Sequence, residues 1–418
     1  MSGRPCRTTW FGWAAIALAM ACWSGDDADT LAPGVPTLVT AVPGAGSVAL
    51  WWQDPTDTDL AGIRLTYEPG GGALDVAPGA GTASFDGLVD GTEYTFLLVA
   101  RDVAGHESPG IAVRAIPGNV IGRTAPRRLH VVVALTIANT GQDLTQMSIV
   151  FPYVPRNPYQ DVGAIALLPG GEVLDVPDSE NRYVRYLVTG SDLPLAGETR
   201  TWSYEFDVTL YTVVADLAAV TGPYDYDATT ELYARYTGDS GVWVVPGHPT
   251  IRSVSDTLWG ESTDLPDYVR RCYDYVATSF TYAAPHGHES LDDILAAGTG
   301  DCGCLSAVFV SLLRARGIPA RHLVSRMPDS GHAWADFYLE RYGWIPVDVT
   351  FHMHGADTFG KPTYEGVILS YDQVHEVTAW EGNTNVLDVL QSAYLWYLTH
   401  GGDGTIERTY SITYTALP

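Results

Sequence analysis

A cysteine at the start of a buried helix is the feature that most limits what this chain can fold into. Cys302 opens an apolar run whose members recur at three- and four-residue intervals, which predicts a helix buried in a core. Arg314 and Arg316 fall in its last turn, Gly317 follows, and Pro319 blocks continuation. Unpaired N–H groups and the positive end of the helix dipole stabilise a thiolate at a helix N-terminus. The fold must therefore bring any partner groups to this end of one helix.

Two later motifs can supply a base and a group that orients it. His332 begins an alternating strand, and Gly343 begins a second strand that ends near Asp348. A hairpin places His332 beside Asp348 if its loop has odd length and is centred near Glu340, or contains a bulge. Cys302, His332 and Asp348 are then predicted to be nucleophile, base and orienter. The backbone N–H of Cys302 is a natural oxyanion donor, and the sequence identifies no second one.

These blocks resemble the transglutaminase-like superfamily, whose papain-related α+β core carries a Cys-His-Asp triad. The matching segments are, in chain order, Gly300-Asp301-Cys302, Leu313-Arg314-Ala315-Arg316-Gly317-Ile318-Pro319-Ala320-Arg321, His332-Ala333-Trp334 and Gly343-Trp344-Ile345-Pro346-Val347-Asp348. The family places the helix-end arginine twelve residues after its cysteine, which selects Cys302 over Cys304 as the nucleophile because Arg314 stands at that distance. The resemblance implies a cysteine enzyme that acts on amide bonds through a thioester.

The chain departs from the family pattern at three positions. Cys304 stands where a polar or acidic residue is usual, Leu305 replaces an aromatic residue or histidine, and Val349 replaces proline. These departures leave the triad intact and concern mainly substrate specificity. A disulfide from Cys304 to Cys302 or Cys272 would silence the nucleophile, although a Cys-x-Cys ring is strained. A buried, inert Cys304 is the simpler interpretation.

The first residues are predicted to be a signal peptide, spanning residues 1–21. Arg4 and Arg7 precede an apolar run that ends at Cys22. Small residues before this cysteine resemble the lipobox of bacterial lipoproteins, with Cys22 as the lipidated residue, and an ordinary secretory signal is the alternative. We therefore expect an exported lipoprotein of the cell envelope, either periplasm-facing or surface-exposed. Residues 22–32 would be the spacer between its lipid anchor and the first domain.

The full chain has 418 residues, and this length predicts about two to four domains. Residues 33–118 resemble a fibronectin type III domain, because Leu88 followed by Gly91-Thr92-Glu93-Tyr94 looks like its tyrosine corner. Residues 119–248 are similar to the β-sandwich that precedes such cores. The catalytic core is expected over residues 249–356. Residues 357–418 are expected to complete the core, with a helix over residues 386–399 as one interpretation. The predicted fold class is two N-terminal β-sandwiches, fibronectin type III-like and then Ig-like, followed by an α+β papain-like core.

The charge of the chain bears on its partners. The net charge is −26, and Lys361 is the only lysine, so nucleic acid is not expected to bind. We expect protein or peptide substrates, and a cell-surface or cell-wall ligand for the fibronectin-like domain.

Neither a cofactor nor a metal ion is expected. Two His-x-His pairs lie in loop-like segments with no cysteine or acid at a ligand spacing, so solvated loop or cleft-lining histidines are favoured. The pairs are His286/His288 and His352/His354. A cluster of acids in the first domain is better explained as exposed turn residues than as a calcium loop. Its members are Asp54, Asp57 and Asp59.

Three functions remain open from the sequence. In the first, water resolves the thioester at Cys302 and the protein is a protease or amidase. In the second, an amine resolves it and the protein is a protein-glutamine transglutaminase that cross-links proteins. We favour hydrolysis modestly because water is always present. The third is a non-catalytic surface binding protein, against which the retention of all three triad residues argues.

Overall fold

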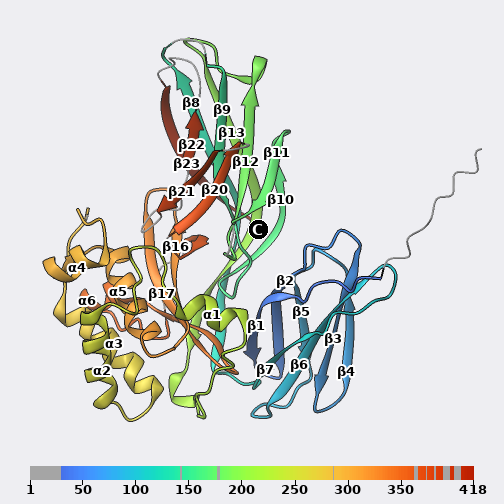
Figure 1. The fold of residues 1–418 in the computed structure, drawn as a ribbon, viewed down its shortest axis with the longest axis vertical. Helices are drawn as coiled ribbons and strands as arrows, with labels where there is room; N and C mark the ends of the chain where they lie inside the picture. Colours follow the sequence, from blue (N-terminus) through green and yellow to red (C-terminus); the bar gives the residue numbers. More distant parts are fainter. Residues whose placement is uncertain are drawn as a thin grey trace, which may run out of the picture.

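The computed structural model describes residues 30–141, 144–176, 179–285, 287–361, 366–372, 374–380, 383–388, 396–399 and 406–418. Figure 1 shows three bodies: a β-sandwich at the lower right, a longer β-sandwich rising above it, and a helix-rich core at the lower left. Two β-sandwiches followed by an α+β core is the predicted fold class, which is thereby confirmed. The described part of the chain contains no helix long and apolar enough to cross a membrane.

The first sandwich consists of a three-stranded and a four-stranded antiparallel sheet. The strands are, in sheet order, β1 (Thr37–Gly44), β2 (Ser47–Gln53) and β5 (Thr82–Asp86), then β4 (Gly72–Val76), β3 (Leu60–Glu68), β6 (Tyr94–Asp102) and β7 (Ile111–Ala115). Alternate residues of β6 are buried, as a sheet with one core-facing side requires. The Tyr94 hydroxyl accepts a hydrogen bond from the Val89 N–H at 3.0 Å. This is the tyrosine corner that the sequence indicated.

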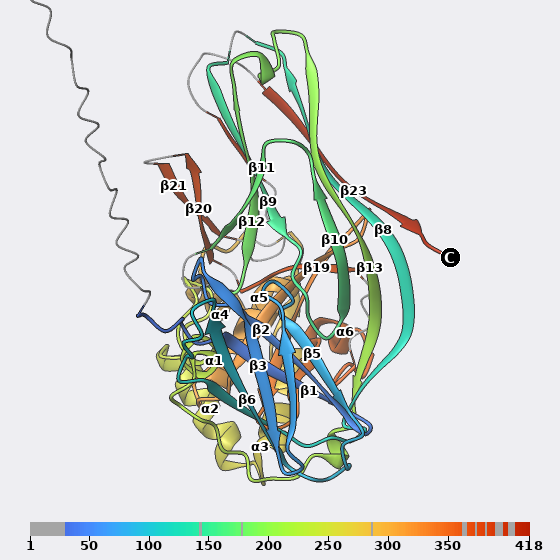
Figure 2. The same cartoon turned by 90° about the vertical axis from the view of Figure 1, so that its right-hand side faces the viewer.

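The second sandwich contains two four-stranded antiparallel sheets. Their orders are β10 (Gln160–Leu167), β13 (Thr199–Ala215), β8 (Ile121–Asn139) and β23 (Ile406–Ala416), and β11 (Gly171–Asp175), β12 (Arg182–Thr189), β9 (Gln146–Tyr153) and β22 (Trp396–Thr399). Side chains from both sheets fill one apolar core. Figure 2 shows β8 and β13 as long curved strands that run down toward the helix-rich core.

The C-terminal segment corrects the prediction that residues 357–418 complete the core. Among the described strands of this segment, β19 (Val367–Tyr371) joins the core sheet, whereas β22 and β23 add the last strand to each sheet of the second sandwich. The helix considered over residues 386–399 is also wrong where the structure describes it, because β21 (Asn383–Asp388), which pairs with β20 (Val374–Trp380), and β22 are strands. These pairings depend on the free edges of β8 and β9, which lie far away in the sequence. The local sequence of β22 and β23 therefore does not predict them.

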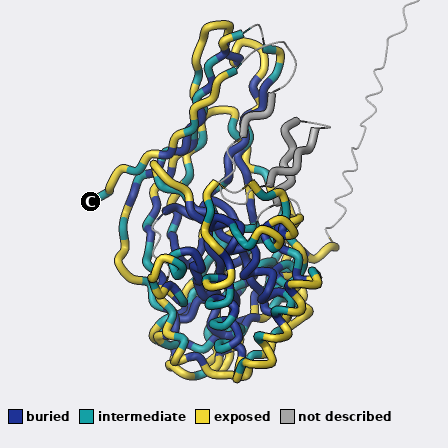
Figure 3. The backbone as a smooth tube through the Cα atoms, turned by 90° about the vertical axis from the view of Figure 1, so that its left-hand side faces the viewer, coloured by how far each residue is buried: buried dark blue, intermediate teal, exposed yellow. Residues whose placement is uncertain are grey.

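The core packs helices against the antiparallel sheet β18 (Gly343–Val347), β17 (Gly331–Leu339), β16 (Ala320–Arg326) and β19. The helices are α2 (Pro249–Gly260), α3 (Leu265–Ser279), α4 (Leu291–Ala297), α5 (Cys302–Arg314) and α6 (Val349–Met353). Every residue of α5 is buried, which explains its nearly continuous apolar sequence. Figure 3 shows that buried backbone concentrates in this part of the molecule.

The segment before the core departs from the predicted domain boundary at residue 248. The 3-10 turn Leu217–Ala219 and helix α1 (Glu231–Thr237) follow β13. Tyr236 packs edge-on against Trp344 of the core, with ring centroids 5.0 Å apart. Residues 217–248 therefore cover the core and do not extend the sandwich.

The β17–β18 hairpin also holds the first sandwich against the core. Arg341 at its tip pairs with Asp225 at 2.9 Å and with Glu93 of the first sandwich. The Ile116 N–H donates to the Arg341 carbonyl at 3.1 Å. Gly343 has φ +91°, and a Cβ there would lie 2.6 Å from the Ala41 carbonyl oxygen, so glycine permits this close approach.

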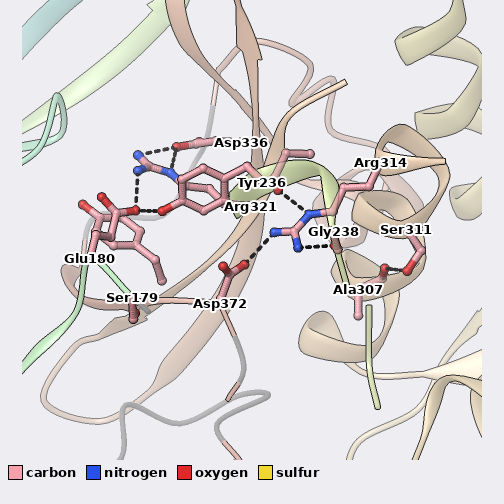
Figure 4. A network of polar contacts seen from close by, with 12 residues as sticks. Ser179, Glu180, Tyr236, Gly238, Ala307, Ser311, Arg314, Arg321, Asp336 and Asp372 are labelled. Atoms are coloured by element: carbon pink, nitrogen blue, oxygen red, sulfur yellow. Dashed lines mark hydrogen bonds and ion pairs between the residues drawn. The ribbon is translucent and has the colours of Figure 1, made fainter. Parts of the chain in front are cut away.

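A buried polar network fixes the second sandwich to the core sheet (Figure 4). Arg321 of β16 pairs with Glu180 at 3.0 Å and with Asp336 of β17 at 3.2 Å. Its guanidinium lies over the rings of Trp344 and Tyr371, at 4.1 and 4.2 Å from their centroids. This side chain therefore joins a residue of the sandwich to two strands of the core.

Candidate active site

The nucleophile candidate occupies the first position of α5. Asp301 is the N-cap residue, and its side chain accepts a hydrogen bond from the Cys304 N–H at 3.2 Å. Cys302 is consequently the first residue in helical conformation and is 6% exposed. Its sulfur lies in the field of the helix N-terminus, where negative charge is stabilised.

The base candidate approaches from the β17–β18 hairpin. The register pairs Leu339 with Gly343 and leaves three loop residues centred on Arg341, which has φ +73°. The loop has the odd length that the sequence required, with its centre one residue beyond Glu340. His332 Nε2 lies 2.6 Å from Asp348 Oδ2. The structure thus brings the predicted base and orienter into direct contact.

The orienter candidate is itself held by the helix that follows it. Asp348 is the N-cap of α6, and its Oδ1 accepts hydrogen bonds from the Thr350 N–H at 3.1 Å, the Thr350 hydroxyl at 2.8 Å and the Phe351 N–H at 3.2 Å. Oδ2 remains for His332. A carboxylate anchored through one oxygen presents the other in a fixed direction. Sequence reasoning missed the role of Thr350, although an Asp-x-Thr segment before a helix is a capping signal.

The electrostatics of His332 favour its protonated form. Burial lowers the pKa of this imidazole, but hydrogen bonds to Asp348 and Cys302, with the negative charges of both, outweigh burial and raise the pKa to about 10. Because Nε2 contacts Asp348, Nδ1 is the ring nitrogen left for Cys302. Cys302, His332 and Asp348 therefore lie in a continuous chain of contacts at one end of α5.

Comparison with known families identifies the part of the chain that contains this site. Residues 252–349 match the profile of the Transglutaminase-like superfamily, and this span includes all three residues. These residues form a transglutaminase-like core. No curated protein matches the chain in sequence.

Solved structures that are similar to parts of this chain include the following three. A candidate cysteine protease from Cytophaga hutchinsonii is 16% identical, with 71% of this chain and 93% of that chain covered and a TM-score of 0.49. The periplasmic domain of TgpA from Pseudomonas aeruginosa is 15% identical, with 53% and 91% covered and a TM-score of 0.29. A two-domain fibronectin type III segment of chicken tenascin is 16% identical, with 43% and 90% covered and a TM-score of 0.18.

The other two described cysteines of the transglutaminase-like core are buried thiols. Cys272 on α3 and Cys304 on α5 are both fully buried, and Cys302 is also a free thiol. Burial raises the pKa of Cys272 to about 12 and, with the charge of Asp301, also raises the pKa of Cys304. Residues two apart on a helix leave it in nearly opposite directions, so a Cys302–Cys304 disulfide would require α5 to unwind. This geometry favours the inert interpretation of Cys304.

The described histidines of the two His-x-His pairs contact other side chains of the protein. His352 lies in α6, which corrects its placement in a loop, and it stacks on Tyr273 with ring centroids 4.1 Å apart while pairing with Asp274 at 3.0 Å. His288 Nε2 is 3.3 Å from the Thr299 hydroxyl. Within the described ranges, no group of three or more His, Cys, Asp or Glu side chains could hold a metal ion. His286 lies outside those ranges.

The acids of the first domain hold turns together. Asp54 accepts hydrogen bonds from the Trp52 indole and the Gly79 N–H, both at 2.6 Å, and Asp57 accepts one from the Gly34 N–H at 3.0 Å. The predicted lipidation site, Cys22, lies outside the described residues, as does the rest of the predicted signal peptide.

Tyr282 is a site residue that sequence reasoning missed. It lies in the two-residue strand β14 (Thr281–Tyr282), which pairs in parallel with β15 (Thr299–Gly300) just before the nucleophile. Burial and the charges of Cys302, Asp301 and Asp348 raise the pKa of its hydroxyl. Tyr282 is 38% exposed, and the raised pKa keeps its hydroxyl protonated, so that it can donate a hydrogen bond near the Cys302 charge. The strand signal Phe-Thr-Tyr after α3 could have indicated it.

Proposed function

We propose that this protein is an exported cysteine enzyme that attacks amide bonds of protein or peptide substrates. The observation that carries the proposal is the contact chain from Cys302 at the first position of α5 through His332 to Asp348, with the carboxylate 2.6 Å from the imidazole. Nucleophile, base and orienter in this order are the groups that acyl transfer requires.

The reaction proceeds in two stages. The Cys302 sulfur attacks the carbonyl carbon, the C–N bond breaks, and the protonated His332 gives its proton to the leaving amine. A thioester joins the acyl group to Cys302. Water then attacks the thioester while neutral His332 takes a water proton, and the acid and the free Cys302 are released. Asp348 keeps the imidazole oriented and stabilises its positive charge in both stages.

Two donors can stabilise the oxyanion that forms during attack. The backbone N–H of Cys302 is unpaired by position, because the first N–H groups of a helix have no partner within it. The Tyr282 hydroxyl is the second donor in this proposal. Its location beside β15 and its interaction with the Cys302 charge support that role.

Hydrolysis is the favoured outcome for the thioester. Water reaches any exposed site, whereas cross-linking needs a second protein to supply an amine. The one lysine of this chain, Lys361, pairs with Asp357 at 3.3 Å, so the protein offers little to self-cross-linking. Protein-glutamine transglutamination remains the second candidate, since an amine resolves the same intermediate.

One experiment distinguishes these reactions. Reduced mature protein is incubated with a glutamine-rich protein and a fluorescent primary amine, and mass spectrometry follows amine incorporation, deamidation and peptide cleavage. Cys302→Ala should abolish every product, while the matched control Cys304→Ala should retain them. Products of cleavage or deamidation alone establish hydrolysis, and incorporated amine establishes transfer. The enzyme proposal fails if wild-type and Cys302→Ala proteins give the same products, which would favour the surface binding protein.

The cell-envelope location is part of the proposal. The apolar run that ends at Cys22 and the acidic spacer after it support a lipid-anchored, exported protein. In that setting the fibronectin type III-like domain would bind a cell-surface or cell-wall ligand. Metabolic labelling with a fatty-acid analogue should mark the wild-type protein and leave Cys22→Ser unmarked. Labelling that persists in Cys22→Ser would contradict lipidation at this residue.

A further inference from the structure

A cavity of about 320 Å³ lies where the second sandwich meets the transglutaminase-like core. Strands β8 and β13 provide one wall, and β17 and β19 of the core sheet provide another. The residues that matter here are Pro126, Tyr159, Leu210, Thr212, Trp334 and Ile368. Most of this lining is aromatic or aliphatic. The charged lining residue is Arg127.

Trp334 connects this cavity to the candidate active site. Its ring stacks beside the His332 ring with centroids 6.0 Å apart. The β17–β18 register pairs Ala335 with Val347, so Trp334 is the residue opposite Asp348. One wall of the cavity is therefore the tryptophan that flanks the His332–Asp348 pair.

Tyr159 of the sandwich fixes that wall in place. Its ring packs edge-on against Trp334 with centroids 6.1 Å apart, and its hydroxyl donates to Asp336. Asp336 and Trp334 are alternate residues of β17 and so leave the strand on the same face. The sandwich consequently supports the tryptophan from the cavity side.

The sandwich strands are distorted where they reach the cavity. The β8–β13 ladder shifts register between Leu210 and Thr212, and Ala125 on the facing strand has φ +49°. Tyr211 lies opposite two residues of β8, Ala125 and Pro126, so the extra residue of this bulge is on β8. The Tyr211 side chain is held by a hydrogen bond to Asp161 at 2.8 Å and by Arg123, whose guanidinium lies 3.8 Å from the ring centroid. Bulges and left-handed non-glycine residues cost free energy and concentrate beside functional sites. Here they shape the wall that faces Trp334.

We propose that this cavity binds one large apolar side chain of the peptide substrate, next to the amide that Cys302 attacks. The inference rests on the proposed function and adds the substrate class: peptides with an aromatic or large aliphatic residue beside the reacting residue. The volume lies at the lower end of the roughly 300–1,000 Å³ typical of ligand pockets, which suits a side chain and excludes a folded partner. The aromatic and aliphatic side chains of the lining favour an apolar side chain, because they cannot replace the hydration that a polar group loses on entering.

The first part of the test measures binding without turnover. Cys302→Ala protein is titrated calorimetrically with short peptides in which the residue on either side of a central glutamine is Gly, Leu, Phe or Asp. We expect one of the two flanking positions to favour Leu and Phe over Gly by about 10-fold to 200-fold in Kd, since apolar pockets discriminate by this amount. Asp at that position should bind no better than Gly. Equal affinity for all four residues at both positions would overturn the proposal.

The second part fills the cavity. Thr212→Trp should remove the preference for Leu and Phe, because the new indole occupies the cavity. Thr209→Trp is the matched control, because Thr209 is also a half-buried threonine of β13 but does not line the cavity. Alkylation of Cys302 by iodoacetamide in each variant checks that the site is still assembled. If Thr212→Trp retains both normal alkylation and the full preference, the cavity is not the subsite.

Turnover of the same peptides by the wild-type protein separates this inference from the proposed function. Binding preference without any product that depends on Cys302 refutes the enzyme and keeps the cavity as a binding site. Product that depends on Cys302 without side-chain preference refutes the subsite and keeps the enzyme.

Discussion

His332 Nε2 lies 2.6 Å from Asp348 Oδ2, while Oδ1 of the same carboxylate caps helix α6. A single aspartate therefore anchors a helix and an imidazole at once. Its hydrogen bond is the leading contribution that raises the pKa of His332 against burial, to about 10. The charge state of the proposed base consequently depends most on Asp348, with a further contribution from Cys302.

Asp348→Asn should lower kcat by about 10²-fold to 10⁴-fold, because the amide supports the imidazolium poorly and permits the wrong tautomer. The same change removes the main influence that raises the pKa of His332. The alkaline limb of kcat/KM in the wild type reports loss of the His332 proton and should lie near pH 10. In Asp348→Asn it should move to lower pH, measured with a peptide substrate from pH 5 to 11.

The pH dependence of stability provides an independent check on the direction of the His332 pKa shift. The folded-state pKa of His332 exceeds its ordinary value of 6.5, so protonated His332 stabilises the fold fully below about pH 6.5 and loses this contribution as pH rises through about 10. The difference in free energy of unfolding between wild type and Asp348→Asn should shrink over that window. The assignment would be contradicted if Asp348→Asn left the alkaline limb of kcat/KM unmoved and the stability difference from the wild type did not change with pH.

Tyr282→Phe should lower kcat by about 10²-fold with little change in KM, because an oxyanion donor acts mainly in the transition state. Tyr275→Phe, a half-buried tyrosine of α3, is the matched control and should behave like the wild type. Steady-state kinetics on one peptide substrate gives both constants. If KM rises and kcat does not fall, Tyr282 contacts the substrate without serving the oxyanion.

Features set by neighbouring residues could be predicted from the sequence. Helix α5 begins at Cys302 as expected and ends at Arg314, two residues before Arg316, which was predicted to lie in its last turn. The start and the approximate end were predictable because the turn before Cys302 and the stop signals near Gly317 are adjacent to the helix. The hairpin loop is odd, as a contact between His332 and Asp348 required. Both predictions use local rules of capping and strand alternation.

Features set by distant pairings could not be predicted. Strand β23 pairs with β8, about 280 residues earlier, and its alternating sequence would suit any exposed sheet edge. Tyr282 joins the site only through the two-residue pairing of β14 with β15. The cavity beside Trp334 exists because the sandwich docks on the core, and nothing in either segment alone specifies that contact.

Gly300→Ala should displace the start of α5. A Cβ at this position would lie 2.5 Å from the Cys304 Cβ, a distance that no rotamer change can relieve. We expect a loss of about 1–3 kcal/mol in free energy of unfolding, as for other overpacked core positions, and slower alkylation of Cys302. Urea denaturation and the rate of reaction with iodoacetamide measure the two effects.

Two further variants test whether the clash with Cys304 causes the effects of Gly300→Ala. Gly260→Ala, at the end of α2, places its Cβ in open space and should be neutral or slightly stabilising. Cys304→Gly in the Gly300→Ala background removes the clashing atom and should restore Cys302 alkylation, despite the cost of a helical glycine. A double variant as slow as Gly300→Ala would show that the clash is not the reason.

Arg321→Ala should destabilise the protein by about 3–5 kcal/mol, because it leaves the buried Asp336 carboxylate and the largely covered Glu180 without their shared cation. Arg321→Lys should restore little of this loss, since an ammonium cannot bridge both acids while stacking between Trp344 and Tyr371. The control is Arg316→Ala, which breaks a pair with the exposed Asp256 and should cost about 1 kcal/mol or less. Urea unfolding followed by tryptophan fluorescence compares the three variants. Because Arg321 joins the sandwich to the core, its loss should also split one unfolding transition into two, and an unsplit transition with wild-type stability would refute this role.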